Sequence, residues 1–278
     1  MRVVRASHAG ACYGVQRALD LAVEAAAEGE GASTLGPLIH NPQVVAELAE
    51  RGVRAVDGPA EVERGAVIIR SHGVTPAVRR AVEDRGLPLI DATCPHVARA
   101  QKAAADLALR CGRVVVVGEA GHPEVEGLVA CAREAGGEVA VAAGPADLPA
   151  GIEAPVGIVV QTTQTRETLD AVVAAFAARG IEAEVKNTIC FATRQRQESA
   201  AALAGEVDAI VVIGGRNSSN TTRLADICAA ACPRTHHIEA PEEIDPAWFA
   251  GCESVGVTAG ASTPEDQIAA VAERLEAL

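Results

Sequence analysis

The chain has 278 residues, of which 49% are hydrophobic and only 2% aromatic, a composition that favours helices on parallel sheets over an all-β fold. The formal net charge of −13 argues against nucleic acid as a standing partner, because phosphate backbones select basic surfaces. The N-terminal residues lack the apolar stretch of a signal peptide, and no run approaches the roughly 20 apolar residues of a membrane span. We therefore expect a soluble, cytoplasmic protein with no membrane partner.

Short apolar runs that end in small polar loops recur along the chain, and helical periodicity follows each of them. The runs cover 66–69, 114–117, 158–160 and 209–213. Helical faces are clearest at 15–26 and 169–177, and Thr263 followed by Pro264 predicts a capped start for the last helix. Continuous apolar runs that alternate with helices indicate an α/β fold with parallel strands covered on both faces.

A second regularity is the spacing between cysteines and later polar loops. The same interval of 28 residues separates three pairs, which are Cys12 and His40, Cys94 and His122, and Cys190 and Ser218. We interpret the chain as three similar α/β units at 1–93, 94–189 and 190–278, each a small, mostly parallel sheet flanked by helices, with the C-terminal end able to pack back on the first. Coincidence of loop spacing is the alternative.

Further polar loops follow at His72, Thr162 and Ser262. Ligands of open parallel sheets bind at the carboxyl ends of the strands, where all these loops are expected. If the three sheets turn these ends toward one another, the loops converge on one central site.

The eight cysteines separate by context. Cys111, Cys131 and Cys228 share helical faces with apolar residues, which favours core packing over metal binding. Cys232 forms a Cys-x3-Cys pair with Cys228, for which core packing is again the better interpretation, and Cys252 has no clear assignment.

The remaining three cysteines, Cys12, Cys94 and Cys190, lie in loops beside polar residues. Cys12 and Cys190 directly precede helices, where the positive end of the helix dipole stabilises a thiolate. Three thiolates suit an iron–sulfur cluster in which one iron has no protein ligand, and an open metal position is what a catalytic site needs. Electron carriers generally use four cysteines instead.

An anion pocket is the second predicted feature. His40, His72 and His122 each follow a strand, although a lone histidine there is more often structural. Imidazoles, hydroxyls and helix-N-terminal amides can hold a diphosphate, and 217–222 and 260–263 have this character. Ordinary N-capping is the alternative for both segments. The nucleotide-binding glycine motifs of the usual kinds are absent from the sequence.

Glu124 is the best candidate for a proton donor, because it follows His122 closely among Pro123, Val125 and Leu128. A carboxyl group in a dry pocket has its pKa raised, which keeps a proton available near neutral pH. Glu126 is the competitor, and either residue could merely favour the helix dipole.

Ordered motifs over nearly the whole chain resemble those of the 4-hydroxy-3-methylbut-2-enyl diphosphate reductases of the non-mevalonate isoprenoid pathway. They are Cys-Tyr-Gly-Val-Gln-Arg-Ala at 12–18, Gly-Pro-Leu-Ile-His-Asn-Pro-Gln-Val-Val at 36–45, Ser-His-Gly-Val at 71–74, Asp-Ala-Thr-Cys-Pro at 91–95, Gly-His-Pro-Glu-Val-Glu-Gly at 121–127, Gln-Thr-Thr at 161–163, Thr-Ile-Cys-Phe-Ala-Thr at 188–193, Asn-Ser-Ser-Asn at 217–220 and Thr-Ala-Gly-Ala-Ser-Thr-Pro at 258–264. Small departures at Ala11 and Gln195, where the family often has Phe and Asn, concern only local packing.

The resemblance implies one [4Fe-4S] cluster per chain, held by Cys12, Cys94 and Cys190, and three α/β units around a pseudo-threefold axis. It implies that Glu124, Thr162 and His122 are catalytic. It also implies a diphosphate site made of His40, His72, His122, Ser218, Asn220 and Ser262, with Ser219 nearby and Thr162 beside the substrate hydroxyl. The implied reaction is a reductive dehydroxylation that yields isopentenyl and dimethylallyl diphosphates, with a ferredoxin or flavodoxin-type electron donor.

Two other function classes remain open. A non-catalytic iron–sulfur redox sensor or electron carrier would bind no diphosphate and would need a fourth ligand, for which Cys252 is available. A zinc-dependent phosphohydrolase would use Cys and His without iron or sulfide.

Overall fold

The computed structural model describes residues 1–28 and 31–278. By its internal contacts the chain divides into two compact units. The first comprises Met1–Gln16, His40–Val44 and Phe191–Leu278, and the second comprises Arg17–Ile39 and Val45–Cys190.

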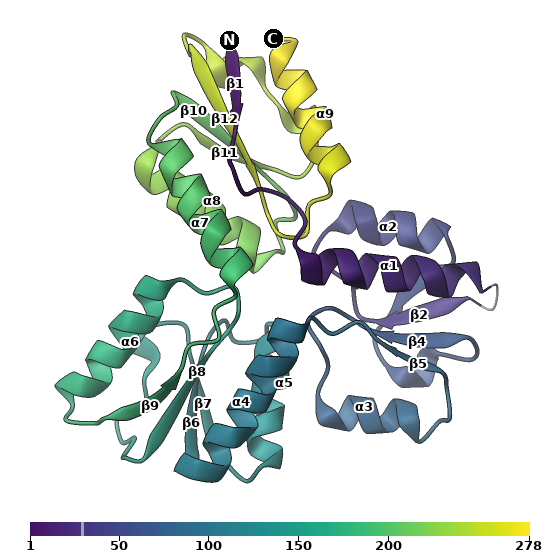
Figure 1. Ribbon diagram of the computed structural model, residues 1–278, viewed down its shortest axis with the longest axis vertical. Helices are drawn as coiled ribbons and strands as arrows, with labels where there is room; N and C mark the ends of the chain where they lie inside the picture. The colour runs from purple at the N-terminus through teal and green to yellow at the C-terminus, as the bar shows by residue number, and fades with distance from the viewer. Residues whose placement is uncertain (29–30) are drawn as a thin grey trace. The chain divides into compact units, whose positions relative to one another are not determined.

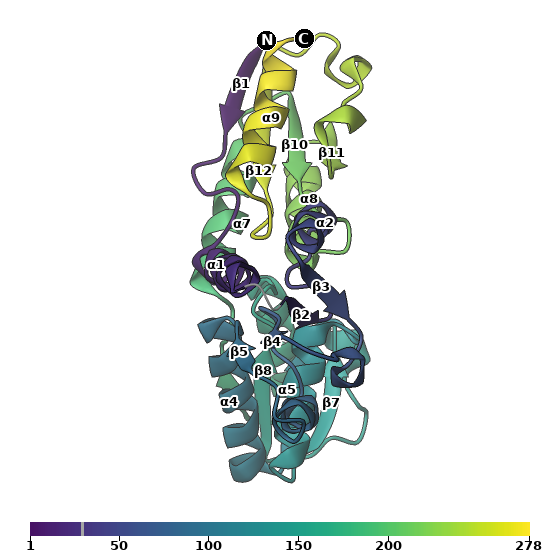
Figure 2. The ribbon, with the colours of Figure 1, turned by 90° about the vertical axis from the view of Figure 1, so that its right-hand side faces the viewer.

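The first unit contains a parallel sheet with the strand order β1-β12-β10-β11. Its strands are β1 (Arg2–Arg5), β12 (Ser254–Ala259), β10 (Ala209–Ile213) and β11 (Thr235–Ile238). The helices α7 (Phe191–Ala204) and α8 (Ser219–Ala231) cover one face and α9 (Glu265–Glu276) covers the other (Figures 1 and 2). Two short 3₁₀ helices, η3 (Pro241–Glu243) and η4 (Pro246–Phe249), follow β11.

Strand β10 shows why an uninterrupted apolar run is needed here. Val211 and Ile213 pack in the cluster that contains Val271 of α9, whereas Ile210 and Val212 pack in the cluster that contains Leu224 of α8. Successive side chains of a strand point to opposite faces, so a strand covered on both faces must be apolar at every position.

The second unit contains two parallel sheets. One has the order β3-β2-β4-β5 and the other β7-β6-β8-β9. The first of these is built from β2 (Ala32–Leu35), β3 (Val53–Val56), β4 (Ala66–Ile69) and β5 (Leu89–Asp91), with α1 (Tyr13–Ala27), α2 (Pro42–Glu50), η1 (Pro59–Glu61) and α3 (Pro76–Glu83). The helices α1 and α2 each begin in residues of the first unit.

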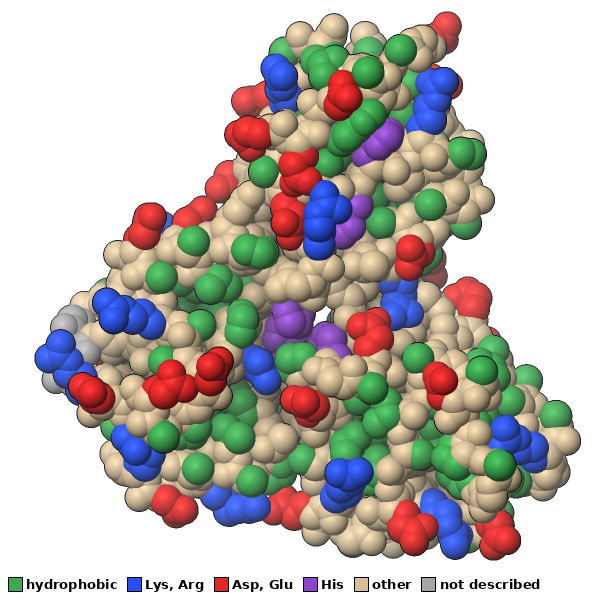
Figure 3. All heavy atoms as spheres, turned by 180° about the vertical axis from the view of Figure 1, so that it is seen from behind, with side chains coloured by type: hydrophobic (Ala, Val, Ile, Leu, Met, Phe, Trp, Pro, Cys, Tyr) green, Lys and Arg blue, Asp and Glu red, His purple; other side chains and the backbone are tan. Residues whose placement is uncertain are grey.

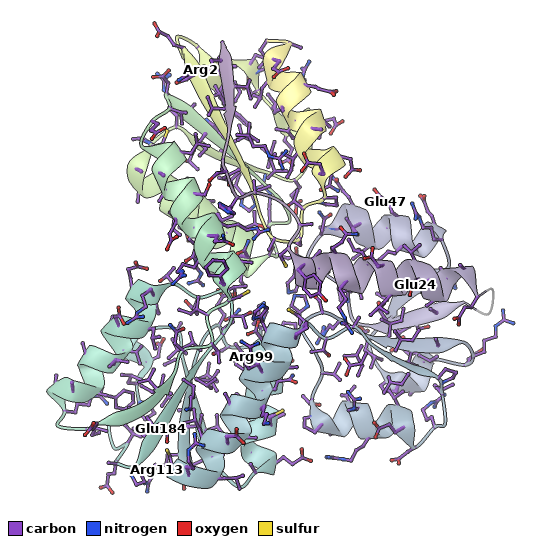
Figure 4. All side chains as sticks on the ribbon, viewed as in Figure 1. Arg2, Glu24, Glu47, Arg99, Arg113 and Glu184 are labelled. Atoms are coloured by element: carbon purple, nitrogen blue, oxygen red, sulfur yellow. The ribbon has the colours of Figure 1, made fainter. Side chains whose placement is uncertain are left out.

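The other sheet of the second unit has apolar clusters on both of its faces. It is built from β6 (Arg113–Val117), β7 (Glu138–Ala142), β8 (Val156–Val160) and β9 (Ala183–Lys186), with α4 (Pro95–Cys111), α5 (Pro123–Glu134), η2 (Pro145–Asp147) and α6 (Arg166–Ala178). The helices α4 and α5 lie on one face and α6 on the other (Figure 1). Figure 4 shows Arg99 near the start of α4, whereas Arg113 and Glu184 lie at the opposite end of this layer.

The three sheets share one plan, which confirms the predicted α/β class. In each four-stranded sheet, one edge strand is followed by a loop that carries a cysteine. These strands are β5 before Cys94, β9 before Cys190 and β1 before Cys12. Strand β1 pairs with β12 from the far end of the chain, through Val3 opposite Val255. The division at 1–93, 94–189 and 190–278 stays a prediction, and the observed sheets assign the first strand to the C-terminal sheet.

The predicted cap of the last helix is wrong in detail. Pro264 occupies the N-cap position of α9 and provides no side-chain hydrogen bond. The Thr263 hydroxyl donates instead to the carbonyl oxygen of Ile213 at 3.0 Å, so it fastens the loop after β12 to the end of β10. A buried hydroxyl needs a partner, and here the neighbouring strand supplies it.

Among the helices that the structure describes, none combines the length and the apolar character that crossing a membrane requires. Figure 3 shows acidic and basic side chains interspersed over one face of the molecule, so the net charge of −13 is not gathered there in one patch.

Candidate active site

One backbone hydrogen bond recurs at all three predicted cluster cysteines. The N–H group of Cys94 donates to Ser71 O at 2.9 Å, that of Cys190 to Thr162 O at 2.9 Å, and that of Cys12 to Ala261 O at 3.1 Å. In each case the acceptor lies in the loop after the neighbouring strand, at or beside a predicted substrate residue (His72, Thr162 or Ser262). Each cysteine loop is therefore tied to a polar loop of its own sheet.

Each of these cysteines also stands directly before a helix. Cys94 is the N-cap residue of α4, and Cys12 and Cys190 immediately precede α1 and α7. All three are of intermediate burial.

The structure does not place the three cysteines in one unit. Cys12 belongs to the first unit, whereas Cys94 and Cys190 belong to the second. Within the described residues of either unit, no three His, Cys, Asp or Glu side chains form a group that could hold a metal ion.

Arg196 of α7 holds the loop that precedes Cys12. Its buried guanidinium donates to Gly10 O at 2.9 and 2.7 Å, to Ala11 O at 3.2 Å and to Ala192 O at 2.8 Å. The Cys12 loop is thereby fixed against the first turn of the helix that follows Cys190. Arg196 was not predicted from the sequence, where the available signal was its alignment with Ala192 and Ala200 at helical spacing.

Glu124 is the buried acid of the second unit. Its side chain is only 1% exposed, and burial raises its pKa from 4.5 to about 7. The Thr162 N–H group donates to Oε1 at 2.6 Å and the Thr162 hydroxyl donates to Oε2 at 2.8 Å. These two bonds lower the pKa, and the nearby charge of Glu119 raises it further, but the loss of solvation dominates. Glu126 is exposed, so of the two acids only Glu124 has the dry surroundings that the sequence predicts.

His122 is the N-cap residue of α5. Its Nδ1 atom accepts a hydrogen bond from the Glu124 N–H group at 3.1 Å. Because Nδ1 is an acceptor, the neutral ring carries its proton on Nε2. The ring of His72 lies edge-on to that of His122, with centroids 5.7 Å apart. The two predicted substrate histidines of this unit are therefore neighbours.

Gln101 of α4 fills the space between the loops that carry these histidines. A Cβ atom at Gly127 of α5 would lie 2.6 Å from Gln101 Nε2, and one at Gly73 would lie 2.7 Å from the same atom. Glycine at both positions therefore allows α4, which follows Cys94, to approach both histidine loops. Gln161 Oε1 accepts from the Glu119 N–H group at 2.9 Å.

Asn220 is the most informative residue of the first unit. It is 5% exposed, and neither its Oδ1 nor its Nδ2 atom has a hydrogen-bond partner among the described residues. A buried amide without partners costs free energy, so such a group in a native protein calls for a ligand or a water molecule. A diphosphate would supply acceptor oxygens for Nδ2.

Ser218 and Ser219 begin α8 beside Asn220. Ser218 is the N-cap residue, and its hydroxyl oxygen accepts from the Thr221 N–H group at 3.3 Å. The capping alternative is therefore correct for Ser218, which does not prevent the hydroxyl hydrogen from reaching a ligand. A Cβ atom at Gly260 would overlap Thr221 Oγ1, so glycine there allows the loop after β12 to lie against the start of α8.

Ser262 and His40 meet in the first unit. The Ser262 hydroxyl donates to His40 O at 3.0 Å, and Asn41 Nδ2 donates to Ser262 O at 3.0 Å. Asn41, which the sequence analysis did not single out, also accepts from the N–H groups of Gln43 and Val44 at the start of α2. It therefore joins the helix start after His40 to the Ser262 loop.

The predicted site residues thus form two sets. The first unit brings together Cys12, His40, Ser218, Ser219, Asn220 and Ser262, and the second brings together His72, Cys94, His122, Glu124, Thr162 and Cys190. The donor set fits the implied groups: three accessible thiols at helix starts for an iron–sulfur cluster, and hydroxyls with an unpartnered amide for a diphosphate.

The other cysteines behave largely as predicted. Cys111, Cys228 and Cys232 are buried, and burial raises the pKa of Cys228 to about 12, so it stays a thiol. Cys131 is half-buried rather than a full core residue. Cys252 is half-buried against the α9 side of its sheet and accepts from Arg234 Nη1 at 3.1 Å. None of these surroundings resembles those of Cys12, Cys94 and Cys190.

Comparisons with known proteins cover the whole chain. The family model described as LytB protein matches residues 3–276. A 4-hydroxy-3-methylbut-2-enyl diphosphate reductase of Citrifermentans bemidjiense is 51% identical over 282 residues, covering 100% of this chain and 98% of that relative. The corresponding protein of Geotalea daltonii is 47% identical, covering 100% of this chain and 98% of its own length.

Two solved structures are similar in fold. A structure of (E)-4-hydroxy-3-methyl-but-2-enyl diphosphate reductase, described as the terminal enzyme of the non-mevalonate pathway, has a TM-score of 0.73 and 44% identity, with full coverage of both chains. The Plasmodium falciparum reductase has a TM-score of 0.87 at 23% identity, covering 96% of this chain and 86% of that one, which supports the fold alone.

Proposed function

Because the chain belongs to the LytB protein family, we propose that it carries out the reductive dehydroxylation of 4-hydroxy-3-methylbut-2-enyl diphosphate. The reaction consumes two electrons and two protons, breaks the terminal C–O bond and releases water together with isopentenyl or dimethylallyl diphosphate. This is the last step of the non-mevalonate isoprenoid pathway, and the enzyme is an oxidoreductase.

The family consists of iron–sulfur enzymes, and we propose Cys12, Cys94 and Cys190 as the ligands of a [4Fe-4S] cluster. Their support is the common setting at helix starts and the recurring hydrogen bond to a neighbouring polar loop. When bound by these three cysteines, such a cluster would supply single electrons and a Lewis-acidic iron. The residues of the chain then have to bind, orient and protonate the substrate.

The observation that best supports the proposal is the set of contacts of Thr162, which joins the proposed proton donor to a proposed cluster ligand. Its N–H and hydroxyl groups hold the Glu124 carboxyl group, while its carbonyl oxygen accepts from the N–H group of Cys190. The proton donor and a cluster ligand are thus attached to one residue. When Glu124 is protonated, it can donate to Thr162 Oγ1, and the threonine hydroxyl is then free to donate to the substrate hydroxyl.

A pKa of about 7 suits Glu124 to this role. At neutral pH about half of the molecules hold the proton, so the acid is available without a strong penalty for giving it up. Protonation of the substrate hydroxyl turns a poor leaving group into water. His122, whose Nδ1 accepts from the Glu124 backbone, orients the turn on which the acid stands.

For the diphosphate we propose His40, His72, His122, Ser218, Ser219, Asn220 and Ser262. These residues offer hydroxyl, imidazole and amide donors, which can hold a polyanion in a chain of net charge −13. The burial of Asn220 without a partner is the strongest single support. We propose that the protein is cytoplasmic, where cysteine thiols stay reduced. We also propose a ferredoxin or flavodoxin-type protein as the electron donor to the cluster.

Turnover of the cluster-loaded enzyme under anaerobic conditions tests the function. With reduced methyl viologen and the substrate, we expect two viologen radicals to be oxidised for each isopentenyl or dimethylallyl diphosphate detected by mass spectrometry. Cluster-loaded protein that leaves the substrate intact would contradict the proposal.

A further inference from the structure

Arg17 of α1 holds the loop that precedes Cys94. Its Nη2 atom donates to Asp91 O at 3.1 Å and its Nη1 atom donates to Thr93 O at 3.3 Å. Thr93 directly precedes Cys94, so its carbonyl group belongs to the same peptide unit as the N–H group of the cysteine. That N–H group donates to Ser71 O at 2.9 Å. The peptide unit before this proposed ligand is therefore held at both of its polar groups.

Arg196 of α7 makes the same arrangement at Cys12. Its buried guanidinium donates to Ala11 O at 3.2 Å, and Ala11 directly precedes the cysteine. The Cys12 N–H group donates to Ala261 O at 3.1 Å, so this peptide unit too is held at its carbonyl and at its amide. Two further bonds from the guanidinium, at 2.7 and 2.9 Å, go to the carbonyl oxygen of Gly10, which has a φ of +84°. The loop is thereby fixed just before the proposed ligand.

The two arginines lie on helices that themselves follow proposed cluster cysteines. Cys12 directly precedes α1, which carries Arg17, and Cys190 directly precedes α7, which carries Arg196. The helix that begins after one proposed ligand therefore fastens the loop that carries another.

The loop before Cys190 is held by a hydroxyl group. Thr188 Oγ1 accepts from the Val160 N–H group at 3.0 Å and donates to Val160 O. Each of the three cysteine loops is thus bound by a side chain just before the cysteine, in two cases through a guanidinium.

We propose that Arg17 and Arg196 are positioning residues for the iron–sulfur cluster, a proposal that rests on the proposed function. Residues that contact metal ligands orient those ligands, and their loss typically costs ten- to a hundredfold in metal affinity or activity. A guanidinium suits this task because its planar array of N–H groups can bind two neighbouring carbonyl oxygens at once. By fixing the peptide units before Cys94 and Cys12, the arginines reduce the conformational freedom that these loops would lose on binding iron.

The two arginines hold their loops to different degrees. Arg196 is 7% exposed and donates four hydrogen bonds to carbonyl oxygens, at 2.7 to 3.2 Å. Arg17 is half-buried and donates two, at 3.1 and 3.3 Å. We therefore expect the loss of Arg196 to affect the cluster more than the loss of Arg17.

The experiment measures how fast a chelator removes iron from the cluster-loaded enzyme. Arg196→Met and Arg17→Met keep an unbranched side chain that binds no carbonyl oxygen, and Arg196→Lys keeps a donor without the planar fork. Under anaerobic conditions with excess EDTA, we expect iron loss to be at least tenfold faster in Arg196→Met and severalfold faster in Arg17→Met. Arg196→Lys should fall between the wild type and Arg196→Met. The EPR spectrum of the reduced cluster should change in the same order, because it reports the geometry of the ligands.

Arg85→Met is the matched control for the loss of a guanidinium–carbonyl contact. Arg85 Nη2 donates to Val62 O at 2.6 Å, and neither residue lies in a loop that carries a cysteine. Its iron should leave at the wild-type rate. Thermal unfolding of every variant is measured as well, and chelation is followed at a temperature at which all of them are folded. Faster iron loss then cannot come from global unfolding.

Iron that leaves Arg17→Met and Arg196→Met at the wild-type rate, with an unchanged EPR spectrum, would overturn the proposal. Equal acceleration in Arg85→Met would also overturn it, since the arginines would then serve the fold alone. If Arg196→Met does not fold, Arg17→Met and Arg196→Lys give the same test. These outcomes leave the proposed function intact, whereas wild-type protein that takes up no cluster refutes the proposed function together with the positioning role.

Discussion

Thr162 donates hydrogen bonds to both carboxyl oxygens of Glu124, from its N–H group at 2.6 Å and from its hydroxyl at 2.8 Å. These bonds fix the acid at the end of α5 that faces the loop after β8. Burial nonetheless raises the pKa of Glu124 to about 7, so this carboxyl group can keep a proton near neutral pH although Thr162 donates hydrogen bonds to it.

Glu124→Gln should abolish most turnover while keeping the fold and the cluster. Glutamine preserves the shape and can accept from the Thr162 N–H group, but it has no acidic proton to deliver. We expect kcat to fall by about 10²–10⁴, the usual worth of a general acid, with iron content unchanged. Turnover equal to that of the wild type would remove Glu124 from the mechanism.

The same substitution should change how stability depends on pH. The pKa of about 7 in the folded protein exceeds the ordinary value of 4.5, so the favourable contribution of Glu124 to the free energy of unfolding is fully present below pH 4.5. It is lost as pH rises through 7, by about 3 kcal/mol in total. The free energy of unfolding of the wild type should therefore fall relative to Glu124→Gln over this range. Parallel pH profiles would contradict the assigned pKa.

Turnover should follow the protonated fraction of Glu124. With substrate and reduced viologen saturating, we expect kcat to decline above pH about 7, approaching a tenfold loss per pH unit. Thr162→Val, which removes the hydroxyl contact to Oε2, is the informative companion variant. Since that hydrogen bond lowers the pKa, its loss should shift the decline to higher pH. An unshifted profile would show that another group titrates.

Asn220→Leu should separate stability from substrate binding. The amide is buried and lacks partners among the described residues, so an apolar side chain of similar size removes a desolvation cost of about 1–3 kcal/mol. We expect an equal or higher melting temperature and at least a tenfold higher KM for the substrate. Lower stability with an unchanged KM would mean that the amide serves the fold.

Serine substitutions should distinguish the cysteines that bind the cluster from those that do not. Replacing Cys12, Cys94 or Cys190 should reduce bound iron and sulfide sharply, because each removes a ligand. Replacing Cys131 or Cys252, which are also half-buried, should leave the metal content intact. Iron loss in Cys252→Ser as well would favour a closed four-cysteine carrier, whereas full iron content in any of the first three variants would contradict the proposed ligand set.

Much of this architecture could be predicted because burial leaves strong local patterns. The runs at 114–117 and 209–213 are apolar at every position since helices cover both faces of their sheets. The dry setting of Glu124 was predictable from its apolar neighbours, and the core cysteines from their helical faces. The family resemblance supplied the roles that no local pattern could.

Other features depend on partners far along the chain. The four residues of β1 reveal nothing of their pairing with β12, which lies some 250 residues later. The hold of Arg196 on the Cys12 loop and the fit of Gln101 between two glycines are likewise tertiary. The missing hydrogen-bond partners of Asn220 could not be predicted, because an asparagine in a polar run is equally typical of a helix N-cap.

Mössbauer spectroscopy of the anaerobically prepared, iron-57-loaded enzyme tests the central claim most directly. Three cysteine ligands should leave one iron distinct from the others, and only its signal should change when the substrate is added. A cluster whose irons are all equivalent and indifferent to substrate would show a complete set of protein ligands, and would contradict the reductase account.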